Sequence, residues 1–346
     1  MEQQHIGKRS ILFAHPPTVL SYASVVGRKE AQGPLCGSFD LSLEEGHFGQ
    51  STWEQGEAQM QKTVLNLALQ KGNRKDTDLD AVFLGDLLNQ CMGSSFSMRN
   101  RGIPTLGLYG ACSTMAESLL LASMTLSGGF ARTVAAMTSS HFASSERQYR
   151  FPLGYGGQRT PTAQWTVTGA GAVILENTQG ATEPLSSLAN ISICSATIGT
   201  VVDSGIKDAN NMGAAMAPGA FETIRCHLED FGRTVKDYDL IVTGDLGALG
   251  SAALRKLLET EGITPGEKLT DCGELIFHRR KQDVHCGGSG CGCSAAVLCG
   301  YLLGQLRRRK LSRILFCGTG ALLSPVSVQQ GLTIPAVCHA VEITSN

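Results

Sequence analysis

One cysteine of this sequence stands where a glycine-rich turn meets an apolar helix, and it is the residue best placed to do chemistry. Cys112 follows Gly110 and Ala111 and precedes an apolar run that continues to Leu119. Unpaired N–H groups and the positive end of the helix dipole at such a position favour thiolate over thiol, and a thiolate is a nucleophile. The chain has 12 cysteines, however, and most intracellular cysteines are small buried apolar residues. Both interpretations of Cys112 stand at this point.

Composition narrows the class of protein. The 346 residues suggest two domains or one large duplicated domain, at roughly 150 residues per domain. Lys and Arg number 29 against 30 Asp and Glu, so the charge balance gives no reason to expect nucleic acid as a partner. Glycine, at 41 residues, suits an α/β protein with tight strand-to-helix turns. The polar N-terminus and the lack of a long apolar run indicate neither a signal peptide nor a membrane span, so we expect a reducing compartment and free thiols.

Periodic patterns predict the elements that must position Cys112. Apolar residues at helical spacing predict a helix over 59–70, and a short acidic turn then leads to a buried strand over 81–84. A strand is also expected over 10–13. The remainder of residues 6–58 is expected to be irregular.

Part of this pattern of predicted helices and strands occurs twice in the sequence. The stretch 78–85 has a counterpart at 237–244, and both ends give the same offset, since 237 minus 78 and 244 minus 85 are each 159. Likewise, Cys112 lies 20 residues before Arg132 and a strand, and Cys293 lies 20 residues before Arg313 and a strand. We therefore predict an ancestral duplication, with halves at residues 1–180 and 181–346, each alternating helices with strands of a mostly parallel sheet.

A duplicated α/β half with a cysteine at a strand-to-helix turn resembles the thiolase superfamily, which includes thiolases and ketoacyl synthases. The resemblance implies a layered αβαβα fold in which Cys112 would form an acyl-thioester. The sequence departs from that family at two places where a catalytic histidine is expected. Ser289 stands at the first, and residues 243–246, which stand where the second histidine should follow a second-half strand, contain none. Cys317, followed by Gly318, resembles the family's second, proton-transferring cysteine, although a core cysteine at a strand end is an equal alternative.

Five further stretches together resemble the stage V sporulation protein AD family of endospore-forming bacteria: residues 23–30, 33–35, 48–54, 146–152 and 288–295. This resemblance implies binding of dipicolinic acid (pyridine-2,6-dicarboxylate), possibly carried as its calcium chelate, within a system that moves it across the inner membrane of the forespore and spore. It also implies a peripheral position on the cytoplasmic side, docked on integral-membrane partners. The fold resemblance adds a homodimer, with the segment 132–137 as the expected edge.

A site for a flat dianion needs cationic or N–H donors around an aromatic-sized slot, and Arg suits carboxylates best. The segment after the first-half strand offers His141, Arg147, Arg150 and Arg159 as anion ligands and Tyr149 as a stacking surface, with Cys112, Ser289 and Gly318 in the inherited acyl site. Each charged residue is equally open to interpretation as a solvated loop charge. Cys286, Cys291 and Cys293 lack a second paired ligand set, so we expect no zinc, and we expect no cofactor.

Three functions follow as hypotheses. In the first, the chain binds dipicolinate at a degenerate acyl site, because a missing general base usually costs about 10²–10⁴ in rate. In the second, it is a working acyltransferase that uses Cys112, with Cys317 or His141 as proton shuttle. In the third, it is mainly a scaffold for a membrane channel. The missing histidines favour the first.

Overall fold

Two sets of five strands with the same order carry the fold. The computed structural model describes residues 4–149, 159–177 and 190–345. In the first set β5 runs parallel to both β6 and β7, while β9 runs antiparallel to both β7 and β3. In order across the sheet these strands are β3 (Thr18–Gly27), β9 (Gly169–Glu176), β7 (Thr133–Ser140), β5 (Ala81–Gly85) and β6 (Thr105–Leu108).

The second set repeats these directions. β11 is parallel to β12 and β14, and β15 is antiparallel to β14 and β10. The strands are β10 (Ile191–Thr197), β15 (Ala336–Ser345), β14 (Arg313–Ala321), β11 (Leu240–Thr243) and β12 (Leu269–Asp271). An antiparallel contact between Thr18 of β3 and Ser192 of β10 joins the sets. Each set is therefore mixed, with more antiparallel pairing than the alternating helix–strand pattern predicted.

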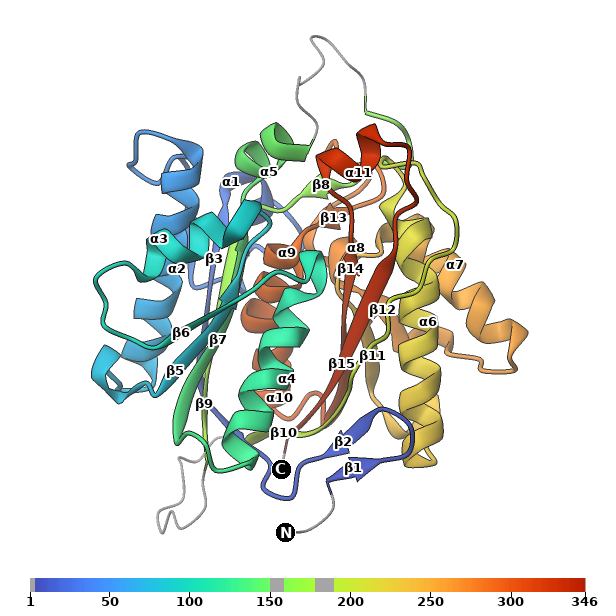
Figure 1. Cartoon of the computed structure of the whole chain (residues 1–346), viewed down its shortest axis with the longest axis horizontal. Coiled ribbons are helices and arrows are strands. Elements are labelled where there is room, and N and C mark those ends of the chain that lie inside the picture. The colour runs from blue at the N-terminus through green and yellow to red at the C-terminus, as the bar shows by residue number, and fades with distance from the viewer. Residues whose placement is uncertain (1–3, 150–158, 178–189, 346) are drawn as a thin grey trace.

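Helices separate and cover the two sets of strands (Figure 1). α4 (Thr114–Ser127), α9 (Cys291–Val297) and α10 (Leu303–Arg307) lie between them. α4 and α9 are buried on nearly every side, and α10 buries its two leucines. α2 (Trp53–Lys71) and α3 (Met92–Met98) cover the first set, and α6 (Met212–Phe231) and α7 (Gly247–Thr260) cover the second. The layered αβαβα arrangement predicted from the sequence is confirmed.

Short elements complete the described chain. They are β1 (His5–Ile6), β2 (Ser10–Leu12), α1 (Arg28–Ala31), β4 (Leu41–Leu43), α5 (Phe142–Tyr149), β8 (Trp165–Thr166), α8 (Cys272–Ile276), β13 (Gly288–Ser289) and α11 (Pro325–Gln329). β8 and β13 form a separate two-stranded sheet. The division predicted at residue 180 falls outside the described residues and stays a prediction.

The expectation of an irregular stretch over 6–58 is wrong. It contains β3, a ten-residue strand in the middle of the sheet, and eight of its ten residues are buried. Because helices cover both faces of this strand, small, polar and apolar residues follow one another without the alternation that marks a half-exposed strand. Thr18, Ser21 and Ser24 are buried in this way.

The expected dimer edge is also wrong. Residues 133–137 belong to β7, which lies between β9 and β5 and is buried along its whole length. A strand with a partner on each side has no free backbone groups for pairing with another chain. Among the described strands, β6 closes the first set, and its Thr105, Leu106 and Gly107 are exposed.

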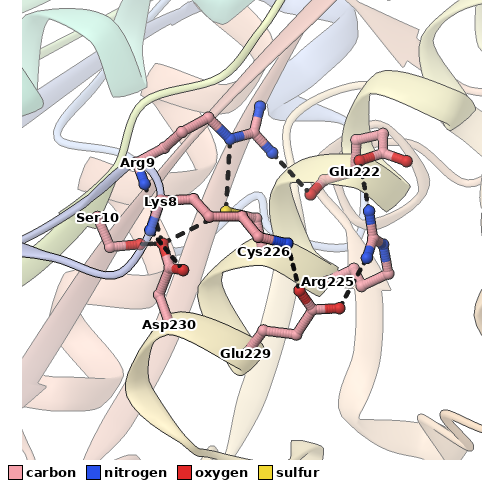
Figure 2. A network of polar contacts seen from close by, with 8 residues as sticks. All are labelled: Lys8, Arg9, Ser10, Glu222, Arg225, Cys226, Glu229 and Asp230. Atoms are coloured by element: carbon pink, nitrogen blue, oxygen red, sulfur yellow. Dashed lines mark hydrogen bonds and ion pairs between the residues drawn. The ribbon is translucent and has the colours of Figure 1, made fainter.

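A hairpin of β1 and β2 fastens the N-terminal residues to α6 (Figure 2). Asp230 accepts hydrogen bonds from the backbone N–H groups of Lys8 and Arg9, at 2.9 and 3.1 Å, and from the Ser10 hydroxyl at 2.8 Å. Partial burial opposes ionisation, but these donors hold the pKa of Asp230 at about 2. The Arg9 guanidinium also donates to the Cys226 sulfur at 3.4 Å. The hairpin is thus held by a charged acceptor on α6, in addition to the pairing of β2 with β10 and the packing of Ile11 against the core.

Within the described ranges, no helix combines the length and the apolar character needed to cross a bilayer.

Candidate functional site

Cys112 lies in a single 3-10 turn, residues 111–113, directly before α4. Ala111 has a φ of +53°, a left-handed conformation that is uncommon outside glycine and is often found at functional sites. Two glycines of β14 let this strand pack against the turn. A Cβ at Gly318 would lie 2.6 Å from the Ala116 Cβ, and a Cβ at Gly320 would lie 2.6 Å from the Gly110 carbonyl oxygen. The turn that carries Cys112 is therefore fixed by backbone contacts from the opposite sheet.

A buried carboxyl group lies next to the thiol. Asp245 comes two residues after the end of β11, at the place where the thiolase resemblance leads one to expect histidine, and its side chain is fully buried. Its carboxylate accepts hydrogen bonds from the Gly290 N–H at 2.8 Å and from the Thr319 and Ser289 hydroxyls at 2.9 and 3.3 Å. The Cys112 thiol donates to the same carboxylate.

This arrangement reverses the electrostatics expected for a nucleophile at a helix start. Burial raises the pKa of Cys112 well above its ordinary value, and the negative charge of Asp245 raises it further. The Gly290 N–H lowers the pKa but does not offset these two effects. The expectation that the helix terminus would favour the thiolate is wrong, because the donors at this end of the site serve Asp245 and the thiol itself is a donor.

A second buried carboxyl group supports the turn that carries Asp245. Asp271, at the end of β12, accepts hydrogen bonds from the Leu246 and Gly247 N–H groups at 2.8 and 2.9 Å. Burial raises the pKa of Asp271 to about 7. The Gln164 amide adds a further brace by donating to the backbone carbonyls of Asp245 and Gly288, at 2.7 and 2.8 Å. The position of Asp245 is therefore set by three neighbouring segments.

A cavity lies beside Cys112, and residues of α5 contribute to its lining. Figure 1 shows α5 and α11 at the same end of the molecule. The volume of the cavity is about 570 Å³ including the open mouth. The lining is mostly apolar and includes a few hydroxyl groups, as is usual for sites that take small ligands. The lining residues are Leu87, Ala111, Cys112, Ser145, Glu146, Tyr149, Thr166, Ala209, Met212, Ser289, Ala321 and Leu323.

Three of the predicted site residues meet in this cavity: Cys112, Ser289 and Tyr149. Tyr149, from α5, lies beside Leu87 and donates its hydroxyl hydrogen to the Leu87 carbonyl oxygen at 2.6 Å. Ser289, from β13, bonds to Asp245 and so belongs to the same group as the thiol. The function of these residues stays a prediction, but their proximity supports one common site.

The predicted anion ligands are not brought into the cavity. Arg147 pairs with Glu54, and Arg159 pairs with Asp283 at 2.6 Å. His141 contacts the Gly46 carbonyl through Nε2 at 2.7 Å and accepts the Ala143 N–H at Nδ1, so both ring nitrogens are engaged, and burial lowers its pKa. None of these side chains lines the cavity. Arg150 lies outside the described residues.

The other two predicted residues contribute to packing. Cys317, in β14, is fully buried among apolar residues beneath α6, and burial together with the adjacent Cys338 raises the pKa of its thiol. It does not line the cavity, and nor does Gly318, which faces Ala116. Among the described residues, no group of three or more His, Cys, Asp or Glu side chains is arranged to hold a metal ion.

Four lining or contacting residues were missed by reasoning from the sequence: Asp245, Ser145, Glu146 and Thr166. Asp245 occupies the place where a histidine is expected, and its position just after a strand is the signal that the sequence offers for it. Ser145 and Glu146 lie in the segment where Arg147 was chosen for its charge. Thr166 follows Trp165 in β8, and the strand pairing breaks before β9 begins at Gly169. This break turns Thr166 towards the cavity.

Comparison with solved structures agrees with this architecture. A 3-ketoacyl-CoA thiolase from human mitochondria gives a TM-score of 0.58 at 14% identity, covering 96% of this chain and all of that one. A 3-oxoacyl-[acyl-carrier-protein] synthase III from Aquifex aeolicus gives 0.51 at 13% identity, covering 95% and 99%. OleA from Xanthomonas campestris gives 0.59 at 15% identity, covering 96% and 99%. At such low identity these likenesses concern the fold.

Sequence comparison is more specific. The chain is 46% identical to Stage V sporulation protein AD of Bacillus subtilis over 335 residues, which cover 97% of this chain and 96% of that protein. The sequence model of the family described as Stage V sporulation protein AD (SpoVAD) matches residues 7–344. The resemblance noted in the sequence is thereby confirmed, and the chain belongs to the stage V sporulation protein AD family.

Proposed function

We propose that this sporulation protein binds dipicolinic acid in the cavity beside Cys112 and does not use Cys112 as an efficient catalyst. The observation that carries the proposal is the pairing of an open cavity with a thiol that donates to the Asp245 carboxylate and whose pKa is raised. A pocket for a small ligand persists, while the group that would activate a nucleophile is replaced by one that stabilises the neutral thiol. This combination suits binding better than acyl transfer.

The lining of the cavity supports a small aromatic acid. Tyr149 and Leu87 provide an apolar wall, and Ser145 and Thr166 provide hydroxyl groups on α5 and β8. The described lining contains no Arg, Lys or His side chain. A ligand that arrives as its calcium chelate carries its own counter-charge, since Ca²⁺ takes six to eight oxygen ligands and a dicarboxylate supplies some of them. We therefore include the chelate among the proposed ligands.

Calorimetry tests this proposal. Dipicolinic acid, with and without Ca²⁺, is titrated into the full chain, and the three benzenedicarboxylic acid isomers serve as matched ligands with other geometry or without the ring nitrogen. We expect saturable binding of dipicolinate that exceeds binding of every isomer. Equal binding of all four acids, or binding of none in either condition, would refute the proposal.

We further propose that the chain serves a system that moves dipicolinate into the developing spore and releases it in germination. In this proposal it is peripheral at the forespore inner membrane, docked on integral-membrane partners. Substitutions in the cavity that abolish dipicolinate binding should then reduce its accumulation in spores. Normal accumulation would favour the scaffold function instead. For the proposed homodimer, β6 is the first-set strand with an open edge, and a monomeric mass by light scattering would contradict it.

A second candidate is acyl transfer, which the direct contact of Cys112 with a carboxyl group and with the cavity favours. In this alternative Asp245 takes the thiol proton while the Cys112 sulfur attacks the acyl carbonyl carbon. The bond between the acyl group and the coenzyme A sulfur breaks, and the proton passes to the departing coenzyme A thiolate. Intact-protein mass spectrometry after incubation with acyl-CoA thioesters of several chain lengths should then show an acyl adduct that Cys112→Ser abolishes. The absence of an adduct across the panel would exclude it.

A further inference from the structure

The polar hydrogens of the cavity lining are nearly all in use. Five described lining side chains carry one: Cys112, Ser145, Tyr149, Thr166 and Ser289. The thiol of Cys112 and the hydroxyl of Ser289 both donate to Asp245. Tyr149 donates to the Leu87 carbonyl oxygen at 2.6 Å, and Thr166 donates to Glu146 at 3.3 Å. Four of the five donors are therefore satisfied within the protein.

Ser145 differs from the other four. It lies on the second turn of α5, its side chain is 2% exposed, and its Oγ has no hydrogen-bond partner. Its neighbour Ser144 bonds to the buried Glu57 at 2.8 Å and so faces away from the cavity. A buried hydroxyl without a partner costs about 1–3 kcal/mol, and the great majority of buried polar groups in native proteins have one. The missing partner of Ser145 is therefore a group that enters the cavity.

We infer that the Ser145 hydroxyl is the hydrogen-bond donor that receives an acceptor oxygen of the bound ligand. The inference rests on the proposed function and names the residue that orients the ligand there. A carboxylate oxygen meets Ser145, while the ring lies along the wall made by Tyr149 and Leu87. Because the Tyr149 hydroxyl is fixed on the Leu87 carbonyl, that residue offers the ligand its ring and not its donor.

The orientation has a consequence for selectivity. Ser145 lines the cavity although it is only 2% exposed, so a ligand meets it with an atom at its end rather than with a ring face. A carboxylate oxygen fits this requirement, and hydrogen bonds to charged acceptors are about twice as strong as neutral ones. A ligand of the same ring size without a carboxyl group leaves Ser145 unsatisfied and loses this interaction. Ser145 thus selects for an acid rather than for an aromatic ring alone.

The test is dipicolinate calorimetry on the full chain with Ser145→Ala and Ser145→Cys. The cysteine variant keeps nearly the same volume with a weaker donor. Ser118→Ala is the matched control, because Ser118 is buried on α4, donates to the Met115 carbonyl at 2.9 Å and does not line the cavity. We expect about a 10- to 100-fold loss of affinity for Ser145→Ala, a smaller loss for Ser145→Cys and no change for Ser118→Ala.

The outcomes separate the two proposals. Unchanged affinity in Ser145→Ala and Ser145→Cys, with normal binding by the unaltered chain, would overturn the role of Ser145 and leave dipicolinate binding standing. Failure of the unaltered chain to bind would refute the proposed function, and the role of Ser145 with it. A loss in Ser145→Ala that Ser118→Ala reproduces would also overturn the inference, because it would reflect general loosening. Thermal unfolding of each variant identifies a folding defect, in which case Ser145→Cys decides.

Discussion

Replacing Asp245 by Asn should activate the Cys112 thiol. In the structure the Asp245 carboxylate accepts the thiol hydrogen and raises the pKa of Cys112. Two unit charges about 4 Å apart interact by about 4 kcal/mol at an effective dielectric constant of about 20. Removing this charge should therefore increase the thiolate fraction of Cys112 at a given pH. Burial of the thiol remains, so the variant should still react more slowly than a free cysteine.

The assay is the rate of alkylation by iodoacetamide at pH 7.5, followed for each cysteine by peptide mass spectrometry. Cys36, which is exposed, serves as an internal reference in every sample. In the unaltered chain Cys112 should be alkylated far more slowly than Cys36. In Asp245→Asn most of this difference between the two alkylation rates should disappear. Asp86→Asn is the control, because Asp86 is a buried carboxyl group after β5 that bonds to Ser94 and Leu88, not to Cys112. A folded Asp245→Asn chain whose Cys112 reacts no faster than in the unaltered chain would refute the electrostatic argument.

Three further predictions concern stability. Burial raises the pKa of Glu30 to about 7, so the folded chain retains a proton that the unfolded chain loses above about 4.5. The contribution of Glu30 to the free energy of unfolding therefore falls by about 1.4 kcal/mol per pH unit as pH rises from about 4.5 to 7. Glu30→Gln should make the free energy of unfolding, measured with urea, depend less on pH; an unchanged dependence would contradict this. Asp230→Ala should cost about 1–3 kcal/mol and release residues 5–12 to proteolysis, whereas an intact hairpin would argue that other contacts hold it. Gly318→Ala should cost about 1–3 kcal/mol because its Cβ would meet Ala116, while Gly37→Ala, with open space around it, should cost little; equal effects would contradict the packing argument.

The sequence was most informative where a pattern repeats along the chain. The helix predicted over 59–70 is the greater part of α2, and the strand predicted over 81–84 is β5. The helix signal comes from apolar residues at the spacing of one buried face, and the strand signal comes from a continuous run of buried apolar residues. β3 was not predicted because helices cover both of its faces, so its polar residues are buried as well and apolar and polar residues do not alternate along it.

The candidate site was predictable only in part. Cys112 and Ser289 were found from motifs, since glycine-rich turns constrain the backbone locally. Arg147 and Arg159 were chosen by charge type, but a charge does not reveal which acid it pairs with, and both pair with acids away from the cavity. Asp245 acquires its effect on the thiol from contacts between segments more than 100 residues apart, which spacing along the chain cannot show.

The hairpin that Asp230 holds has a consequence for synthesis of the protein. The Lys8 N–H and its acceptor on Asp230 are 222 positions apart in the chain. At about 5–20 residues per second, roughly 10 to 45 seconds pass between synthesis of the two, and during this time the first residues lack their final partner. The first set of strands can pair while the ribosome is still translating the second, but the β1–β2 hairpin gains its contacts with Asp230 only afterwards. The contacts of the first residues to be translated are therefore among the last to form.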